Sequence, residues 1–372
     1  MRCGADVGMS FREAVRPPFE PRPRGGVGQP RVVELTFVNN PAAKLPAAPI
    51  GVLAALATGF DRIAARPILL LPPFVLDLFL WLGPPLRISS LAAAVALSVA
   101  VPSGADPTMT AQLTSFRQAL TDLGSRFNLF SALSSLPVGV PSLMAGRMPV
   151  ANPLGKIAGA EVASTLAIMA AWLALTLIGL GLGSMYHIWA ARQVAPRAEL
   201  ATVPMAWGRL ALFSLIGYPA ALARVGVTLL AASLVAYLVP WLGLVLGFLG
   251  FSLVFWLAVY LMFSPHGIIR YRFGVIRSIL ESIQVVRWNL VSTALYLGLT
   301  FTVTWLSTWV WSLPSEGSWY TLLALVGHAF FSAMLLVGSY AFYQGRREWT
   351  LKIRELVAAR QAGQQGPPQA SV

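Results

Sequence analysis

One acidic residue, Asp77, lies inside the apolar run Ile68–Leu82, which is long enough to be a candidate membrane span. An ionised carboxylate in hydrocarbon is costly, so Asp77 should face protein or water and have a polar partner. Pro72 and Pro73 precede it by about one turn and cannot donate helical hydrogen bonds, which predicts a kink or a loosened first turn. The residue is then either an ion site beside a broken helix, as in secondary transporters, or a protonated or hydrogen-bonded Asp that locks helices together.

His328 is the predicted partner of Asp77. Asp77 lies six residues before Gly83, where the first span should end, and His328 lies eight residues after Tyr320, where the last span should begin. At a rise of ~1.5 Å per residue, the two positions are ~9 Å and ~12 Å below the same membrane surface. We therefore expect both side chains to face the interior of a helix bundle at similar depth and to pair.

A row of hydroxyl side chains in the apolar run Leu290–Leu313 is a second candidate polar surface. Its members have the spacing of one helix face: Thr293, Thr300, Thr304 and Ser307. Such hydroxyls ordinarily make hydrogen bonds between membrane helices, and a polar pathway is the alternative interpretation.

The motifs that usually mark catalytic, metal or cofactor sites are missing from the sequence. It has one cysteine and three histidines that are far apart, and neither HExxH nor GxSxG occurs. The glycines of 179–183 look briefly like a phosphate loop, but they lie inside an apolar run and lack the following lysine. We therefore predict a protein that is not an enzyme, with no catalytic, cofactor-binding or metal-binding residues.

The elements that must position these residues are membrane helices. Of the 372 residues, 56% are hydrophobic and 11% are charged, and the mean hydropathy is +0.69, whereas a soluble domain carries about 25% charged residues. The sequence predicts an all-α polytopic helix bundle in the membrane with six spans: Ile68–Leu82, Val162–Met185, Ala220–Val239, Leu242–Phe263, Leu290–Leu313 and Tyr320–Tyr343.

The positive charges predict the orientation of these spans. The formal net charge is +13, and 22 of the 27 Lys and Arg residues lie in 1–67, 186–224, 264–288 and 344–372, on one side of the predicted membrane. This is the positive-inside pattern, so we expect both termini in the cytoplasm and the protein in the cell membrane. Because the charges sit between apolar runs, nucleic acid is excluded as a partner, and the lipid bilayer is the expected one.

The spans divide the chain into a disordered tail (1–48), a transmembrane domain (49–360) with an outer loop at 84–156, and a disordered tail (361–372). Three short amphipathic helices, Gly51–Arg66, Met205–Arg224 and Phe273–Arg287, each precede an outward span, which predicts three units of an in-plane helix plus a hairpin. Interfacial anchoring is the ordinary role of such helices, and docking of a partner is the alternative.

Three predictions concern the outer loop. Asp106-Pro107 should start a helix whose apolar stripe rests on the bundle or covers a substrate entrance, with the members Leu113, Phe116, Leu120, Leu123, Phe127 and Phe130. Ser89–Val101 should be a surface or re-entrant helix. Residues 136–156, with four prolines, should have no regular structure.

The segment Phe263–Trp349 resembles a loose group of bacterial polytopic membrane proteins, which includes the membrane domain fused to some glycerophosphodiester phosphodiesterases. The resemblance rests on Phe263-Ser264-Pro265-His266-Gly267 at the end of a span, a Ser- and Arg-bearing in-plane helix to Arg287-Trp288-Asn289, and a hairpin with a polar tail. It implies a fold more than a function, and phosphodiesterase activity does not carry over because the soluble domain is not in this chain.

Three functions are therefore considered. The first is a permease-like protein or a membrane scaffold without a catalytic site. The second is an accessory protein that docks a soluble cytoplasmic partner through its Arg-rich helices. The third is a lipid-acting membrane enzyme.

Overall fold

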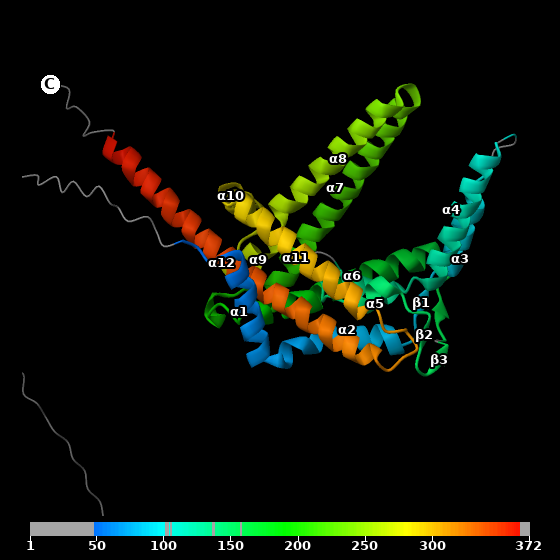
Figure 1. Ribbon diagram of the computed structural model, residues 1–372, viewed down its shortest axis with the longest axis horizontal. Helices are drawn as coiled ribbons and strands as arrows, with labels where there is room; N and C mark the ends of the chain where they lie inside the picture. The colour runs from blue at the N-terminus through cyan, green and yellow to red at the C-terminus, as the bar shows by residue number, and fades with distance from the viewer. Residues whose placement is uncertain (1–47, 101–103, 105, 136–137, 157, 365–372) are drawn as a thin grey trace, which may run out of the picture. The chain divides into compact units, whose positions relative to one another are not determined.

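The computed structural model describes residues 48–100, 104, 106–135, 138–156 and 158–364. Most of the two predicted tails therefore lies outside the described residues. Most of the described chain is helical (Figure 1), in the order α1 Val52–Ala65, α2 Leu71–Leu82, α3 Ser89–Ser98, α4 Pro107–Arg126, α5 Leu143–Arg147, α6 Thr165–Ala191, α7 Val203–Leu238, α8 Pro240–Leu261, α9 Ser264–Tyr271, α10 Val275–Trp288, α11 Leu290–Trp311 and α12 Thr321–Gln364.

Short 3₁₀ turns and two-residue strands connect the helices of the described chain. The 3₁₀ turns are η1 Pro67–Leu70, η2 Leu129–Leu133 and η3 Arg197–Glu199. The strands are β1 Leu86–Arg87, β2 Ala151–Asn152, β3 Gly155–Lys156 and β4 Ala160–Glu161. β1 pairs with β4 in parallel, and β2 pairs with β3 in antiparallel fashion.

The predicted all-α polytopic membrane bundle is confirmed. Among the described residues, five helices are long and apolar enough to cross a membrane: α6, α7, α8 with its continuation α9, α11 and α12. A sixth candidate is the pair formed by α1 and the segment Pro67–Leu82, which is bent by 100° at the break between them and counts as a span only if the two pieces are taken together. Pro72 and Pro73 lie in the first turn of α2, where their missing N–H groups cost little, and the turn before them is 3₁₀. This is the loosened first turn that the prolines predict.

Two of the three predicted in-plane helices, α1 and α10, are separate helices, but the second is not. Residues 205–224 continue without a break into the following span as α7, a single helix of 36 residues with Pro219 inside it. Proline removes one hydrogen bond, and membrane helices tolerate this loss. Arg224 consequently lies within α7. The sequence had suggested a position at the end of a span, and that prediction is wrong.

Helix α12 is the central element of the described fold. Its 44 residues pack against α1, α2, α6 and α11, and it continues beyond the predicted span end at Tyr343 and into the predicted tail as far as Gln364. Small residues allow α1 to cross it closely. A Cβ atom at Gly59 would lie 2.2 Å from the carbonyl oxygen of Met334, so glycine is required at this crossing.

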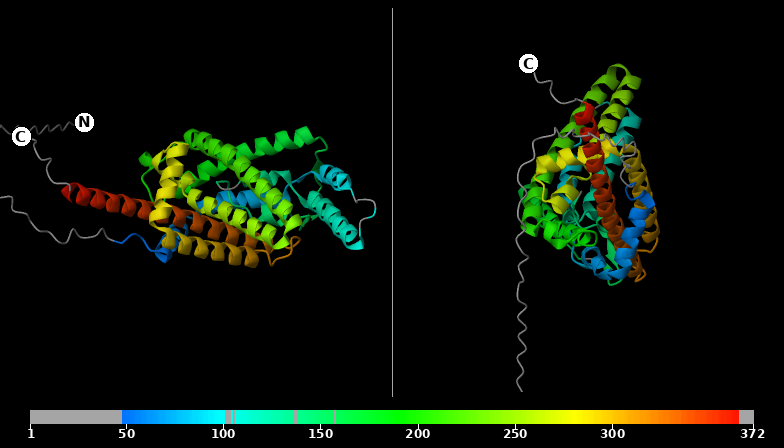
Figure 2. Two further views of the ribbon diagram at one scale, coloured as in Figure 1. Left: turned by 90° about the horizontal axis from the view of Figure 1, so that it is seen from above. Right: turned by 90° about the vertical axis from the view of Figure 1, so that its left-hand side faces the viewer.

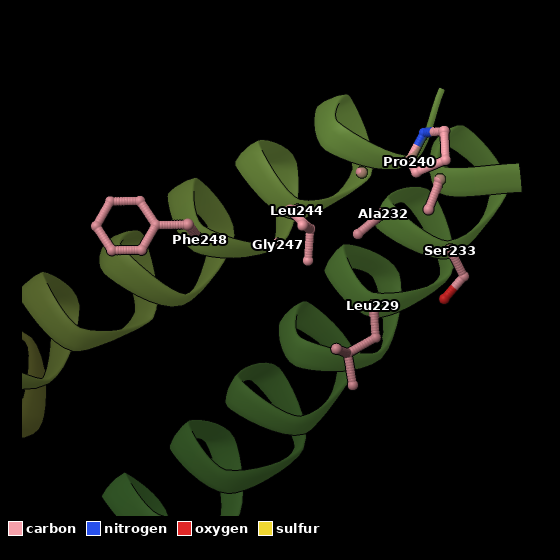
Figure 3. Close-up of a pocket in the computed structure, with 9 residues that line it drawn as sticks. Leu229, Ala232, Ser233, Pro240, Leu244, Gly247 and Phe248 are labelled. Atoms are coloured by element: carbon pink, nitrogen blue, oxygen red, sulfur yellow. The ribbon is translucent and has the colours of Figure 1, made fainter. Parts of the chain in front are cut away.

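The α7–α8 hairpin leaves most of its apolar surface uncovered by protein. It turns at Val239 and reaches away from α11 and α12 (Figure 1). Gly243 packs against Ala236, and Gly250 packs against Thr228. An open groove of about 550 Å³ runs between the two helices (Figure 3) and is lined by apolar side chains and Ser233. In a bilayer, lipid tails would cover such a surface.

The outer segment between α2 and α6 is more regular than predicted. Asp106 caps α4 as expected, with its side chain accepting from the Met109 N–H at 2.8 Å, and α3 packs along α4. Phe116 and Leu123 of the predicted stripe remain exposed, and α4 ends at Arg126, before the last two stripe positions. Residues 138–156 are not irregular: they form α5 and the β2–β3 hairpin.

Candidate functional site

The side chain of Asp77 is completely buried on the face of α2 that packs against α12 and α5. Helical spacing places Pro73, Leu76, Leu80 and Trp81 on the same buried face. A buried carboxylate has lost its hydrogen bonds with water. The protein must therefore supply hydrogen bonds or a counter-charge in their place. The structure supplies partners from three different segments.

Two of these partners come from the outer loop. Oδ1 of Asp77 accepts a hydrogen bond from the Ser142 hydroxyl at 2.5 Å and from the Met144 N–H at 2.9 Å. Ser142 is also the N-cap of α5, because its hydroxyl oxygen accepts from the Ala145 N–H at 3.0 Å. The carboxylate therefore fixes the start of α5 inside the bundle.

The third partner is His328, as the sequence predicts. Its Nδ1 lies 3.4 Å from Oδ2 of Asp77, longer than an ordinary hydrogen bond, and its side chain is buried. On the other side of the ring, Nε2 lies 3.4 Å from the hydroxyl of Ser332, one turn further along α12. The structure thus brings the two predicted residues together inside the bundle, and a functional role for the pair stays a prediction.

Further hydrogen bonds join the same loop to the turn between α11 and α12. Arg147 donates to the carbonyl of Pro314 at 2.9 Å, and the Val150 N–H donates to the carboxylate of Glu316 at 3.1 Å. From α2, the indole of Trp81 donates to the carbonyl of Glu316 at 2.9 Å. Residues 138–152 are therefore tied to α2 and to the α11–α12 turn at the predicted outer end of the bundle.

A second polar cluster lies further along α12 and was not predicted. Nδ1 of His187, on α6, lies 3.1 Å from the hydroxyl of Tyr340, and Nε2 of His266, on α9, lies 2.7 Å from the hydroxyl of Ser339. The rings of His266 and Tyr340 are 4.5 Å apart between centroids. Both histidines are buried. In the sequence, the two histidines look unrelated because they lie far apart along the chain.

One signal in the sequence could have revealed this cluster. The polar residues His328, Ser332, Ser339, Tyr343 and Arg346 recur along α12 at intervals of four, seven, four and three residues. That spacing puts them on one helix face, and each of them is buried or half-buried. A single polar face of α12 therefore serves both clusters.

The predicted hydroxyl face of α11 is only partly correct. Thr293 and Ser307 are buried, and Thr300 is half-buried and donates to the carbonyl of Tyr296, one turn earlier in its own helix, at 2.9 Å. Thr304 is exposed, although helical spacing places it on the same side of α11 as the other three. The four hydroxyls therefore do not line one pathway in the described structure.

The part of the chain that the structure describes contains no group of three or more His, Cys, Asp or Glu side chains placed to hold a metal ion. Comparisons of the chain with protein-family models, with curated proteins and with solved structures gave no match. The resemblance of residues 263–349 to a group of polytopic membrane proteins therefore stays a prediction.

Glu161 fastens α3 to the strand that precedes α6. Its carboxylate accepts from the Ser89 hydroxyl at 2.6 Å and from the Ser90 N–H at 2.8 Å, at the first turn of α3. Slight desolvation raises the pKa of Glu161, but these hydrogen bonds and the charge of Arg87 outweigh that effect, so its pKa lies below the ordinary value. The ionised form is therefore the one that holds α3.

We expect Asp77→Ala to lower the free energy of unfolding by about 2 kcal/mol, because it leaves the buried Met144 N–H and the Ser142 hydroxyl without their acceptor. Thermal unfolding of the purified protein in detergent measures the loss. Asp61→Ala, at an exposed position of α1, is the matched control and should change little.

In a double-mutant cycle, Asp77→Ala and Ser142→Ala should couple by about 1 kcal/mol. Additive effects would show that the hydrogen bond between them contributes nothing.

The second prediction concerns pH. Because folding lowers the pKa of Glu161 from 4.5, its contribution is fully present above about pH 4.5 and is lost as the pH falls through the lowered value. At neutral pH, Glu161→Gln should reduce the hydrogen-exchange protection of the first turn of α3, and the difference from the wild-type protein should disappear in acid. Asp122→Asn, in α4 of the same loop, is the control. Equal protection in both proteins at neutral pH would refute the assignment.

Proposed function

We propose that this protein is a permease-like multi-pass membrane protein, in which residues 138–152 form a gate over the outer end of the bundle and Asp77 is the latch of that gate. The observation that carries the proposal is the buried carboxylate of Asp77, which holds the loop through Ser142 and Met144 and faces His328 on α12. A loop that only covered the surface would not need a carboxylate from inside a span.

The chemistry of the latch supports a role beyond packing. Ionisable side chains inside membrane bundles are rare, face the protein interior and commonly belong to ion or proton pathways. Here a carboxylate and an imidazole, which can each carry a proton, lie beside a helix whose first turn is loosened. Broken helices next to polar groups are a recurring feature of transporter binding sites.

The polar face of α12 gives such a pathway a direction. Ser339, with its partner His266, lies on this face beyond Asp77 and His328 in the direction of Arg346, and Tyr340, with its partner His187, lies beside it. Between the two clusters, the half-buried leucines Leu335 and Leu336 face the core. A conducting state would have to hydrate this apolar stretch, and the described conformation is then the closed one.

We place the protein in the cell membrane with both termini in the cytoplasm. The support is the distribution of positive charge, with 22 of 27 Lys and Arg residues on one side of the spans. The gate then lies outside the cell, together with the α11–α12 turn at 312–320.

Cysteine labelling tests this orientation, and the chain suits it because Cys3 is its one cysteine. A membrane-impermeant maleimide should reach Ser315→Cys from outside intact cells in a Cys3→Ser background. It should reach native Cys3, and Ala359→Cys in the same background, only after permeabilisation. Labelling of positions 315 and 359 from the same side would overturn the proposed topology.

Proteoliposomes test transport. Under an imposed membrane potential, the wild-type protein should carry protons faster than protein-free vesicles, as reported by an entrapped pH-sensitive dye. Asp77→Asn should abolish the flux because it removes the ionisable latch, and Asp61→Asn should not. Cross-linking Arg147→Cys to Ser315→Cys with a cleavable bis-maleimide should stop the flux until the linker is cut, because it ties the gate to the α11–α12 turn.

The contrary outcomes separate the two remaining interpretations. A wild-type flux equal to that of protein-free vesicles would favour a membrane scaffold, in which Asp77 only locks helices together. A flux that persists in the cross-linked protein would keep the transport function but remove the gating role of residues 138–152. Leu154→Cys is the control, because Leu154 is exposed in the same loop. It shows whether attaching the maleimide reagent to the loop, without a cross-link, changes the flux.

A further inference from the structure

Five arginines gather around the turn between α9 and α10. Arg209 donates to the carbonyl oxygens of Arg272 and Phe273, the latter at 3.1 Å. Arg270 pairs with Glu199 at 2.6 Å. Arg272 donates to two carbonyls of the segment before α7, Leu200 at 2.8 Å and Ala198 at 2.6 Å. The other members of this arginine cluster are Arg277 and Arg347.

Arg277 and Arg347 share one aromatic surface. The guanidinium of Arg277 lies 4.3 Å from the centre of the Phe273 ring, and that of Arg347 lies 5.2 Å from the same ring. Arg347 also lies 4.1 Å from the ring of Tyr271, which stacks on Phe273. Stacking on aromatic rings orients guanidinium groups and leaves their N–H edges free to donate.

The cluster carries more positive charge than its partners neutralise. Among the described residues, the carboxylates that pair with it are Glu199, with Arg270, and Glu281, with Arg347 at 3.6 Å. Arg277 is exposed, with its guanidinium over Phe273. Five guanidinium groups against two carboxylates leave a net positive site that suits a phosphate.

Helix α10 carries an apolar surface beside this charge. Its inner face is held to the α8–α9 break by two serines: Ser282 donates to the Tyr260 carbonyl at 2.6 Å and accepts from the Phe263 N–H at 3.1 Å, and Ser278 donates to the Ser264 carbonyl. Its outer face exposes Ile276 by 76% and Leu280 by 54%.

The direction of α10 suits the surface of a membrane. The helix is seen nearly end-on in Figure 1 and runs across the direction of α12 in the left view of Figure 2. A helix that lies across the spans and exposes apolar and cationic side chains together has the character of an interfacial helix.

We propose that the arginine cluster and the exposed face of α10 bind the phosphate headgroup of an anionic phospholipid in the adjacent leaflet. Exposed Arg277 would donate to the phosphate, half-buried Arg347 would add positive charge beside it, and Ile276 and Leu280 would lie against the acyl chains. A soluble anion would use the arginines alone, whereas a lipid uses both surfaces, and the two surfaces adjoin on α10, where Arg277 follows Ile276. The inference does not depend on transport by the protein.

Native mass spectrometry of the full-length protein tests the proposal with phosphatidylglycerol as the probe. Arg277→Gln should weaken phosphatidylglycerol retention about tenfold, the effect of losing one charged hydrogen bond. Arg126→Gln, an exposed arginine at the end of α4, should retain wild-type binding. Ile276→Asn with Leu280→Asn should also weaken retention, although it changes no charge.

Phosphatidylcholine and inorganic phosphate complete the test. Phosphatidylcholine should bind weakly in every variant, and inorganic phosphate should not displace phosphatidylglycerol. Equal retention in the Arg277→Gln and Arg126→Gln proteins would overturn the proposal. Displacement by phosphate, without any effect of the Ile276 and Leu280 substitutions, would identify a soluble phosphate ligand instead. If no lipid is retained and a soluble protein binds only when Arg277 is present, the site is one for docking a partner instead.

Discussion

A carboxylate can be buried in an apolar bundle only while other groups satisfy it, and this constraint organises the end of the bundle that contains α2 and α5. Asp77 projects from α2, yet two of its donors come from the outer loop and its third neighbour comes from α12. Removing any of these segments would leave an unsatisfied carboxylate or unsatisfied donors, which costs more than the bonds themselves contribute. The loop is therefore part of the bundle and not an appendage of it.

The same rule explains the region of α8 to α10. Beside the break between α8 and α9, two serines of α10 make hydrogen bonds to backbone groups of Tyr260, Phe263 and Ser264. α12 connects the two regions, because one of its faces carries polar side chains at both levels while small residues let α1 cross it closely. Apolar surface is exposed where lipid can cover it, above all on the α7–α8 hairpin.

Sequence reasoning was most accurate where a property depends on nearby residues. The bounds of α6 and α11 agree with the predicted spans within about six residues, because apolar length is a local property. The depths of Asp77 and His328 also agreed, because the rise per residue converts a residue count into a distance. The failures are of another kind. Residues 205–224 continue into α7, Thr304 faces outward, and α5 forms in a segment with four prolines, because neighbours from other parts of the chain decide these features.

The sequence by itself determined that this is an all-α membrane protein and which runs are apolar enough to span the membrane. It also determined that a carboxylate inside one of these runs needs a partner. The length of an apolar run and the free-energy cost of burying a charge inside it depend on that segment alone, so both can be inferred from the sequence. Only the tertiary structure decided that Ser142 and Met144 hold that carboxylate, that His187 and His266 meet at Tyr340, and that Arg209 and Arg347 contact Phe273. Those contacts join residues tens to more than a hundred positions apart, and helix packing, which periodicity does not encode, brings them together.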